Sequence, residues 1–296
     1  MNIFDKMMAL DRRWIFLLLA IVCVIAYSLS FEVPVVPTDE VKSVYNHIEA
    51  LKPGQIVFIA IDYDPSSQAE LHPMAYAMME QCFRKNLRVI ITALSQNGPG
   101  MADQAIREIS DSLKYERKYN GVTYPPRDIK RGEDYVFLGY KPYPTLIILG
   151  MGQNFRIPFP NDYYGTPLDQ IPMMKGVINY DQVACVVSLA SGNIADMWIA
   201  DGQGRYNFKM AFGLTGVMGA DYYPYLASGQ IFGLMAGLYG AAQYEKLADN
   251  AGMAKDGMRI QLLAHWLIIA FIVIGNIGFF VTRRQRRMQE KGGTRS

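Results

Sequence analysis

Six polar residues that could carry out chemistry lie in or directly after an apolar run at residues 55–62. They are Asp62, Asp64, Ser66, Ser67, Glu70 and His72. Carboxylates and imidazoles act as nucleophiles, acids or bases, and carboxylates also bind divalent cations. An unalternating run of branched apolar residues is typical of a strand buried on both faces of a parallel sheet, and open α/β sheets bind ligands at the carboxyl ends of such strands. We therefore interpret the six residues as candidate ligand contacts.

The Asp62-Tyr63-Asp64 motif resembles the first motif of the haloacid-dehalogenase phosphotransferases. The resemblance implies that Asp62 is the nucleophile, that Asp64 protonates the leaving group and that Mg²⁺ is the cofactor. Pro65 and Ser66 stand where that family has a small Gly-Thr or Gly-Val turn, and no later acidic pair follows an apolar strand. The magnesium site would therefore be incomplete. A metal-dependent hydrolase or phosphatase is the alternative function, and our main interpretation includes no cofactor and no metal site.

The same loop can instead begin a helix. Ser67 and Glu70 have the spacing of a capping box, whereas Pro73 is favoured at the first position of a helix. The two starts exclude each other, because a helix capped by Ser67 carries Pro73 in its second turn. A start at Pro73 leaves residues 63–72 free to contact a ligand.

Loops after other expected strands supply further candidates. They are Ser95 and Asn97 after one strand, and Ser191, Gly192 and Asn193 after another. The amides of the second loop could hold an anion at a helix start, or Asn193 could be a plain helix cap. The glycines at 150 and 152 do not form a dinucleotide loop, because Phe155 replaces the third glycine.

Histidine and cysteine chemistry is not indicated. His265 lies in an apolar segment, His47 on an expected exposed helix face, and His72 is the one histidine beside acids. No spacing fits a zinc site. Cys82 and Cys185 could pair in an oxidising compartment, but a helix-to-strand bridge is geometrically demanding, so we expect two small buried residues.

Alternating strands and helices must position these loops. Expected strands lie at 55–62, 87–94, 135–139, 144–150, 182–189 and 208–213. Expected helices lie at 38–51, 73–85, 101–118, 167–175, 193–200 and 225–247, and the expected long surface loop is 119–134. Repeated strand, helix and strand imply right-handed crossovers. We predict a three-layer Rossmann-like α/β domain with a mostly parallel sheet over residues 55–248.

Four glycines mark the expected helix 225–247. They are Gly229, Gly233, Gly237 and Gly240, which would share one helix face. Each glycine costs up to about 1 kcal/mol of helix propensity, so a close backbone approach is expected there. The approach would be to the rest of the domain or to a second copy of the chain.

Two uncharged segments are long enough to cross a membrane. Residues 14–31 and 260–282 hold 18 and 23 residues without a charge, and about 20 apolar residues span a bilayer. The first could instead be a cleaved signal peptide, although it is longer than the usual apolar region. Residues 222–244 are also uncharged, but Pro224 and two glutamines favour a buried helix there.

The positions of Lys and Arg predict the orientation of these two transmembrane helices. Three basic residues precede the first segment and six follow the second, which predicts both termini in the cytoplasm. Residues 31–259 hold 20 Lys and Arg against 24 Asp and Glu, so no nucleic-acid partner is indicated. The predicted organisation is a cytoplasmic tail 1–13, a span 14–31, a linker and helix 32–54, the non-cytoplasmic domain 55–248, a linker 249–259, a span 260–282 and a basic cytoplasmic tail 283–296.

Residues 62–76, 134–143 and 225–248 together resemble a group of uncharacterised prokaryotic membrane proteins with a span at each end and a Rossmann-like middle. The resemblance implies this architecture and supplies no catalytic residue. Because the sequence offers carboxylates without a complete catalytic set, we expect a membrane-anchored extracytoplasmic binding or assembly subunit that is not catalytic. Its expected partners are the lipid bilayer and either a second copy of the chain or another membrane protein.

Overall fold

The computed structural model describes residues 11–29, 31–249 and 252–293, with side chains described as far as Arg284. The chain forms two compact units. One is the domain Val35–Lys255, and the other combines Met1–Pro34 with Asp256–Ser296. The two units are described separately below.

The domain is built on a six-stranded sheet in the order β5-β2-β1-β6-β7-β8. Its strands are β1 (Ile56–Asp62), β2 (Arg88–Ala93), β5 (Tyr135–Tyr140), β6 (Cys185–Ala190), β7 (Met210–Leu214) and β8 (Gly233–Ala236). All five neighbouring pairs are parallel. The predicted α/β fold with a mostly parallel sheet is confirmed. The strand order reverses between β1 and β6, where the chain crosses from one half of the sheet to the other.

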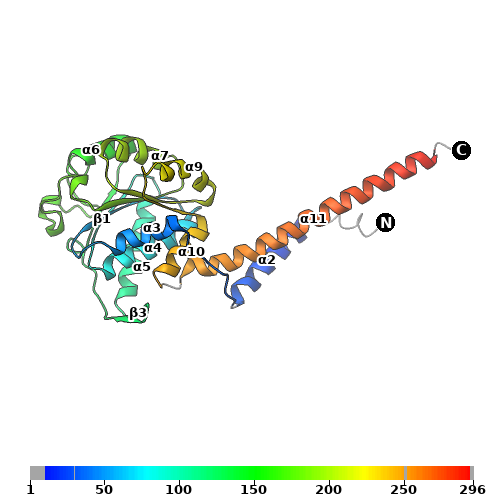
Figure 1. Cartoon of the computed structure of the whole chain (residues 1–296), viewed down its shortest axis with the longest axis horizontal. Coiled ribbons are helices and arrows are strands. Elements are labelled where there is room, and N and C mark those ends of the chain that lie inside the picture. Colours follow the sequence, from blue (N-terminus) through cyan, green and yellow to red (C-terminus); the bar gives the residue numbers. More distant parts are fainter. Residues whose placement is uncertain (1–10, 30, 250–251, 294–296) are drawn as a thin grey trace. The chain divides into compact units, whose positions relative to one another are not determined.

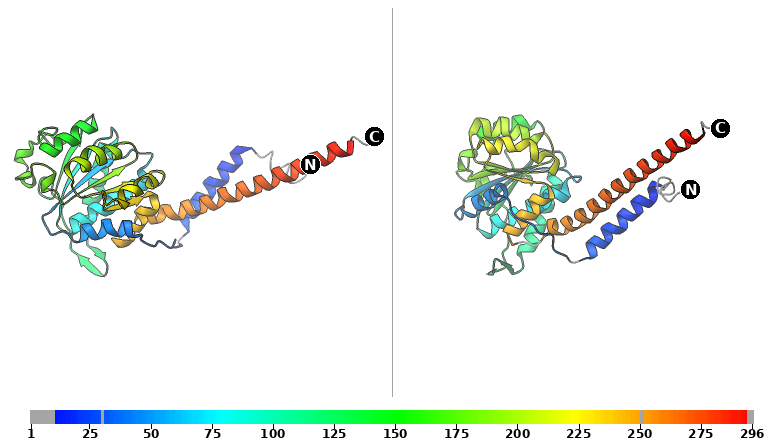
Figure 2. Two further views of the ribbon diagram at one scale, coloured as in Figure 1. Left: turned by 45° about the horizontal axis from the view of Figure 1, so that its top comes forward. Right: turned by 45° about the vertical axis from the view of Figure 1, so that its right-hand side comes forward.

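Helices cover both faces of the sheet (Figure 1). The helices of the domain are α3 (Asp39–Glu49), α4 (Gln68–Arg84), α5 (Gly98–Leu113), α6 (Pro144–Gln153), α7 (Ile194–Met197), α8 (Gly204–Tyr206), α9 (Gly216–Ala227) and α10 (Gly237–Leu247). Helices α3, α4, α5 and α10 lie on one face, and α6, α7 and α9 lie on the other (Figures 1 and 2). The strands are buried on both faces, which explains their continuous apolar sequences.

Short elements complete the domain. They are the hairpin β3 (Arg117–Tyr119) and β4 (Val122–Tyr124), the 3₁₀ turns η1 (Leu168–Gln170), η2 (Pro172–Met174) and η3 (Tyr180–Gln182), and the π-helix η4 (Trp198–Gln203). The core on the α6 face is aromatic: Phe58 stacks on Phe155 at 5.9 Å between ring centroids and meets the edge of Trp198 at 5.6 Å. The expected loop 119–134 therefore contains a strand, and the expected helix 167–175 consists of two 3₁₀ turns.

The prediction of a strand at 144–150 is wrong, because these residues form α6. Tyr143 adopts a left-handed conformation at φ 63°, which turns the chain, and Pro144 occupies the first helical position. The run Leu146–Gly150 is uniformly apolar, and periodicity alone does not separate a short buried helix from a strand.

The single long helix expected at 225–247 is also wrong. The chain there forms the end of α9, then β8, then α10. Gly229 and Gly237 have positive φ values of 76° and 62°, which a helix interior does not contain. A side chain at Gly233 would collide with Val44 of α3, and one at Gly240 would contact the backbone of Met235. The four glycines therefore share no helix face, and the expectation of a seam between copies loses that premise.

The second unit contains two helices, α2 (Arg12–Ser28) and α11 (Met253–Gly293), of which the first three residues of α11 belong to the domain. Among the described residues, one helix is long and apolar enough to cross a membrane, over Met253–Arg284. The 17 residues of α2 extend about 25 Å, which is less than a typical hydrocarbon core of about 30 Å. The predicted first span is therefore not shown. Because α11 begins at Met253, the expected linker 249–259 is helical from that residue onward.

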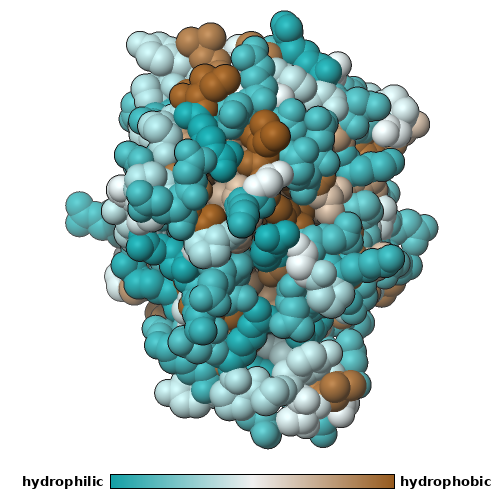
Figure 3. Space-filling view, turned by 90° about the vertical axis from the view of Figure 1, so that its left-hand side faces the viewer, coloured by the Kyte–Doolittle hydropathy of each residue, from teal (hydrophilic) through white to brown (hydrophobic). Residues whose placement is uncertain are grey.

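Figure 3 shows one face of the domain, on which hydrophilic residues predominate and hydrophobic residues gather near the centre and along the upper edge. Isolated exposed apolar side chains are normal on a water-facing protein. In contrast, α11 exposes a run of large apolar side chains, among them Trp266, Ile269, Ile272 and Phe280.

Candidate functional site at the carboxyl edge of the sheet

The point at which the strand order reverses brings two loops together. Residues 63–67 follow β1, residues 191–193 follow β6, and these two strands are neighbours. The amide of Ser191 donates to the carbonyl of Asp62 at 3.4 Å, so the two loops leave the sheet side by side. Open α/β sheets usually bind ligands at such a position, and the region between these two loops, residues 63–67 and 191–193, is called the crevice below.

Asp62 lies beneath this crevice and is not accessible to a substrate. Its side chain is 2% exposed, and its two carboxylate oxygens accept from the amide of Leu94 at 2.6 Å and from the indole Nε1 of Trp198 at 2.9 Å. Burial raises the pKa of Asp62 to about 6, although these two hydrogen bonds oppose the rise. The implied role of Asp62 as a nucleophile is therefore wrong, because the carboxylate ties β1 to the loop after β2 and to η4.

Asp64 is half-buried in the loop after β1. Its carboxylate accepts from the amide of Ser66 at 3.0 Å, from the hydroxyl of Ser66 at 2.6 Å and from the hydroxyl of Ser67 at 3.1 Å. The hydrogen bond from the Ser66 side chain is the main cause that lowers the pKa of Asp64. The carboxylate therefore stays ionised and occupies the space just before the N-terminus of α4.

The helix starts where the first of the two alternatives placed it, but without the capping hydrogen bond. Helix α4 begins at Gln68 with Ser67 at the N-cap position, but the Ser67 hydroxyl makes no capping hydrogen bond. Pro73 lies inside the helix, in its second turn. Glu70 reaches away from its own helix and accepts from the amide of Gly216 at 2.8 Å, in the first turn of α9. The expected capping box is therefore absent, and Glu70 caps a neighbouring helix instead.

His72 is buried in a chain of hydrogen bonds between α4 and α5. Its Nδ1 lies 2.9 Å from the hydroxyl of Tyr63, and its Nε2 lies 2.9 Å from a carboxylate oxygen of Glu108. Gln104 donates to the other oxygen of Glu108 at 2.8 Å and accepts from Gln68 at 3.1 Å. Burial raises the pKa of Tyr63 far above its usual value, so this phenol remains protonated. His72 thus locks two helices together and does not face the crevice.

The remaining candidates lie on the two neighbouring loops. Ser95 has a buried hydroxyl without a hydrogen-bond partner among the described residues, and Asn97 is exposed at the N-cap position of α5. Gly192 and Asn193 are exposed and Ser191 is half-buried. Asn193 occupies the N-cap position of α7 but makes no capping hydrogen bond. Its side-chain amide is therefore available to a ligand, and the alternative of a plain helix cap is not realised.

Thiol and metal chemistry receive no support from the described residues. Cys82 and Cys185 are free and buried, and burial raises the pKa of both thiols. No group of three His, Cys, Asp or Glu side chains in the described ranges is arranged to hold a metal ion.

Sequence reasoning did not identify the partners of the buried candidates. Trp198 donates to Asp62, and Tyr63 and Glu108 contact His72. None of these three partners belongs to a recognisable sequence motif, and Trp198 is distant in the chain from Asp62. A buried indole or phenol usually finds a hydrogen-bond partner, which is the one sequence signal available. His47, expected on an exposed face, is half-buried and packs on Phe232 with ring centroids 4.3 Å apart.

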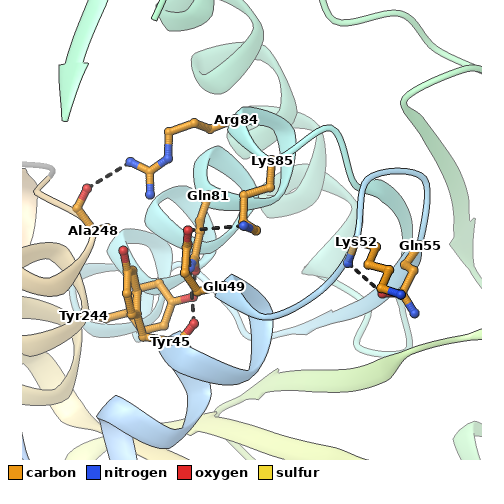
Figure 4. A network of polar contacts seen from close by, with 9 residues as sticks. All are labelled: Tyr45, Glu49, Lys52, Gln55, Gln81, Arg84, Lys85, Tyr244 and Ala248. Atoms are coloured by element: carbon orange, nitrogen blue, oxygen red, sulfur yellow. Dashed lines mark hydrogen bonds and ion pairs between the residues drawn. The ribbon is translucent and has the colours of Figure 1, made fainter. Parts of the chain in front are cut away.

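A second polar network joins α3, α4 and α10 away from the crevice (Figure 4). The buried amide of Gln81 donates to Glu49 at 2.8 Å and accepts from the hydroxyl of Tyr244. Lys85 pairs with Glu49 at 3.2 Å, and Arg84 donates to the carbonyl of Ala248. Burial opposes ionisation of Glu49, but the hydrogen bonds from Gln81 and Lys85 outweigh it and lower its pKa. These contacts fix the helical layer and do not form a site.

Comparisons with known proteins give weak structural matches. No family model matches this chain, and no curated protein matches it. One similar solved structure is an alpha,alpha-trehalose-phosphate synthase (UDP-forming) from Burkholderia vietnamiensis, with 9% identity, a TM-score of 0.32 and coverage of 92% of this chain and 50% of the synthase. Another is the trehalose-6-phosphate synthase OtsA, with 10% identity, a TM-score of 0.28 and coverage of 85% and 47%. The chain spans about half the length of each synthase.

The prediction of a non-catalytic binding or assembly subunit has no counterpart among these matches, both of which are named as synthases. The alternative hydrolase mechanism is wrong at its nucleophile, because Asp62 is buried. At these TM-scores no substrate and no site residue is transferred from the synthases to this chain.

Proposed function

We propose that this chain is a membrane-anchored enzyme whose substrate binds across the carboxyl ends of β1 and β6. The observation that carries the proposal is the strand order β5-β2-β1-β6-β7-β8, which reverses between these two strands. Exposed polar groups from both loops, Ser66 on one and Gly192 and Asn193 on the other, lie at that reversal.

The substrate we propose is a small, neutral molecule rich in hydroxyl groups. Helix N-termini at such an edge usually attract anions. Here the space before α4 holds the ionised carboxylate of Asp64, and the first turn of α9 is occupied by the carboxylate of Glu70. A phosphate would meet these negative charges, whereas a hydroxyl group can donate to Asp64 and accept from the amide of Asn193.

Thermal unfolding of the full chain in detergent micelles tests this function. We expect at least one neutral sugar or polyol in a panel to raise the midpoint of unfolding, whereas any rise with inorganic phosphate at the same ionic strength should be unchanged by substitutions at Asp64 and Asn193. The shift should be lost in Asp64→Asn and Asn193→Ala. It should be retained in Ser228→Ala, whose exposed hydroxyl donates to the carbonyl of Tyr225.

Catalysis is then tested with the ligand that gives the shift. Incubation of that ligand with membranes containing the protein, followed by mass spectrometry, should reveal a product that is absent with Asn193→Ala. The proposal is refuted if no neutral ligand stabilises the protein, or if the shift is unchanged in Asn193→Ala. It is also refuted if the stabilising ligand is recovered without chemical change after incubation with each co-substrate tested.

We further propose that both α2 and α11 cross the membrane, with both termini in the cytoplasm and the domain on the other side. The apolar stretch of α11 is almost entirely unburied within the protein, and basic residues flank both helices on the terminal side. The shortfall in the length of α2 is within the mismatch that a bilayer accommodates by thinning.

Cysteine accessibility tests this topology. Single cysteines at Asn120 and Glu290, in a background without the three native cysteines, should react with an impermeant maleimide from opposite sides of the membrane. Labelling of both from the same side would show that the topology is wrong. A cytoplasmic label at position 120 would place the domain inside the cell.

A further inference from the structure

We propose a second ligand site at the amino edge of the sheet, which binds a small anion through a carboxylate or phosphate group. A cavity of about 350 Å³ opens there, within the range of small-molecule sites. It is lined by the loop before β1, the start of β2 and the chain just before β6. The polar side chains in its lining are Gln55, Arg88 and Gln182.

Arg88 brings a positive charge to the cavity without a counter-charge. Its Nε donates to the carbonyl of Gly54 at 2.8 Å, and one terminal nitrogen donates to the carbonyl of Met173 at 3.3 Å. Within the ranges that the structure describes, it forms no ion pair with an Asp or Glu. A guanidinium has five N–H donors and cannot be deprotonated in a protein, so donors and a full charge remain for a ligand.

The two glutamines present donors to the same cavity. The side-chain oxygen of Gln55 accepts from the amide of Lys52 at 2.7 Å (Figure 4). The side-chain oxygen of Gln182 accepts from the amides of Ile178 and Asn179 at 2.8 and 3.0 Å. Because both oxygens face backbone donors, both NH₂ groups point the other way, and neither makes a hydrogen bond within the described part of the chain.

The polar side chains that line the cavity therefore offer hydrogen-bond donors, and one of them, Arg88, carries a positive charge. Such a set is complementary to a group with several acceptor oxygens, and Arg forms paired hydrogen bonds with a carboxylate or a phosphate. Lys52, next to the lining residue Pro53, adds an exposed positive charge nearby. A neutral polyol would leave the guanidinium charge unpaired, so this site differs in chemistry from the crevice at the opposite edge.

Isosteric charge variants test the site in the full chain in detergent. Gln182→Glu and Gln55→Glu keep the oxygen that accepts from the backbone and replace the free NH₂ by a carboxylate oxygen, so the fold should persist. Gln170→Glu, at an exposed position of η1, is the matched control for charge. Inorganic phosphate and citrate are the probes, at constant ionic strength set with chloride.

We expect phosphate, citrate or both to raise the unfolding midpoint of the native protein and of Gln170→Glu, by about 3 to 6 °C at ten times the dissociation constant. The rise should vanish in Gln182→Glu and Gln55→Glu. A response to phosphate alone would identify a phosphate site, and a response to citrate alone a carboxylate site. The inference is overturned if neither anion shifts the midpoint, or if the glutamate variants respond as the native protein does. Neither result bears on the crevice, which is probed with neutral ligands.

Discussion

Replacing Asp62 by Asn distinguishes a structural carboxylate from a catalytic one. The carboxylate accepts from Leu94 and from the indole of Trp198, and burial raises its pKa to about 6 from the usual 3.8. An asparagine can accept from only one of these donors, since its NH₂ group faces the other. A buried donor left without an acceptor costs about 1–3 kcal/mol.

The sign of the pH effect follows from the raised pKa. Between about pH 4 and 6 the folded protein binds more protons at Asp62 than the unfolded chain does, so stability falls as the pH rises through this window. A shift of about two pKa units corresponds to about 3 kcal/mol. The native protein should therefore carry the full contribution near pH 4 and lose it above pH 6, whereas Asp62→Asn has no such dependence. The variant should be less stable than the native protein near pH 4 and about equal to it at pH 7.5.

Chemical denaturation at pH 4.5 and 7.5, followed by tryptophan fluorescence, measures this difference. Asp64→Asn is the control, because the pKa of Asp64 is lowered and its stabilising contribution should be lost as the pH falls. The reasoning is refuted if the free-energy difference between the native protein and Asp62→Asn is the same at both pH values. A variant that folds with unchanged stability at both pH values but loses all activity would restore a catalytic role for Asp62.

Three further changes test other contacts. Glu70→Ala should destabilise the domain by about 0.5–2 kcal/mol, since it removes the acceptor for the amide of Gly216, and urea denaturation should show this loss. Gly233→Leu should destabilise the domain by about 1–3 kcal/mol or more, because its side chain would collide with Val44; a stable domain with altered crosslinking would instead point to a seam between copies. Burial and the charge of a neighbouring lysine lower the pKa of His47, so stability should fall as the pH drops below about 6.5, and His47→Leu should flatten that part of the profile.

The sequence alone determined the class of fold and five of the six strands of the sheet. The apolar runs of β1, β2 and β6 are continuous because these strands are buried on both faces, whereas a strand with one face in water would alternate apolar and polar residues. The sequence also identified the long apolar stretch after residue 260, because its length matches a bilayer. The structure adds that almost none of this stretch is buried within the protein.

The sequence did not decide the secondary structure of segments that could form either a helix or a strand. Residues 144–150 are almost entirely apolar and residues 225–244 carry no charge, so local pattern did not separate helix from strand. Contact with distant parts of the chain decided the outcome, for example the close approach of Gly233 to α3. Local propensity is a weak prior against such packing.

Tertiary structure alone decided which polar residues remain free for a ligand. The sequence grouped Asp62, Asp64, Glu70 and His72 in one loop, yet only Asp64 stays in the crevice. Glu70 caps another helix, and the other two are held by Trp198 and Glu108, which lie far away in the chain. A buried polar group must find a partner, and that partner is chosen by the packing of strands and helices in space, which spacing along the chain does not reveal.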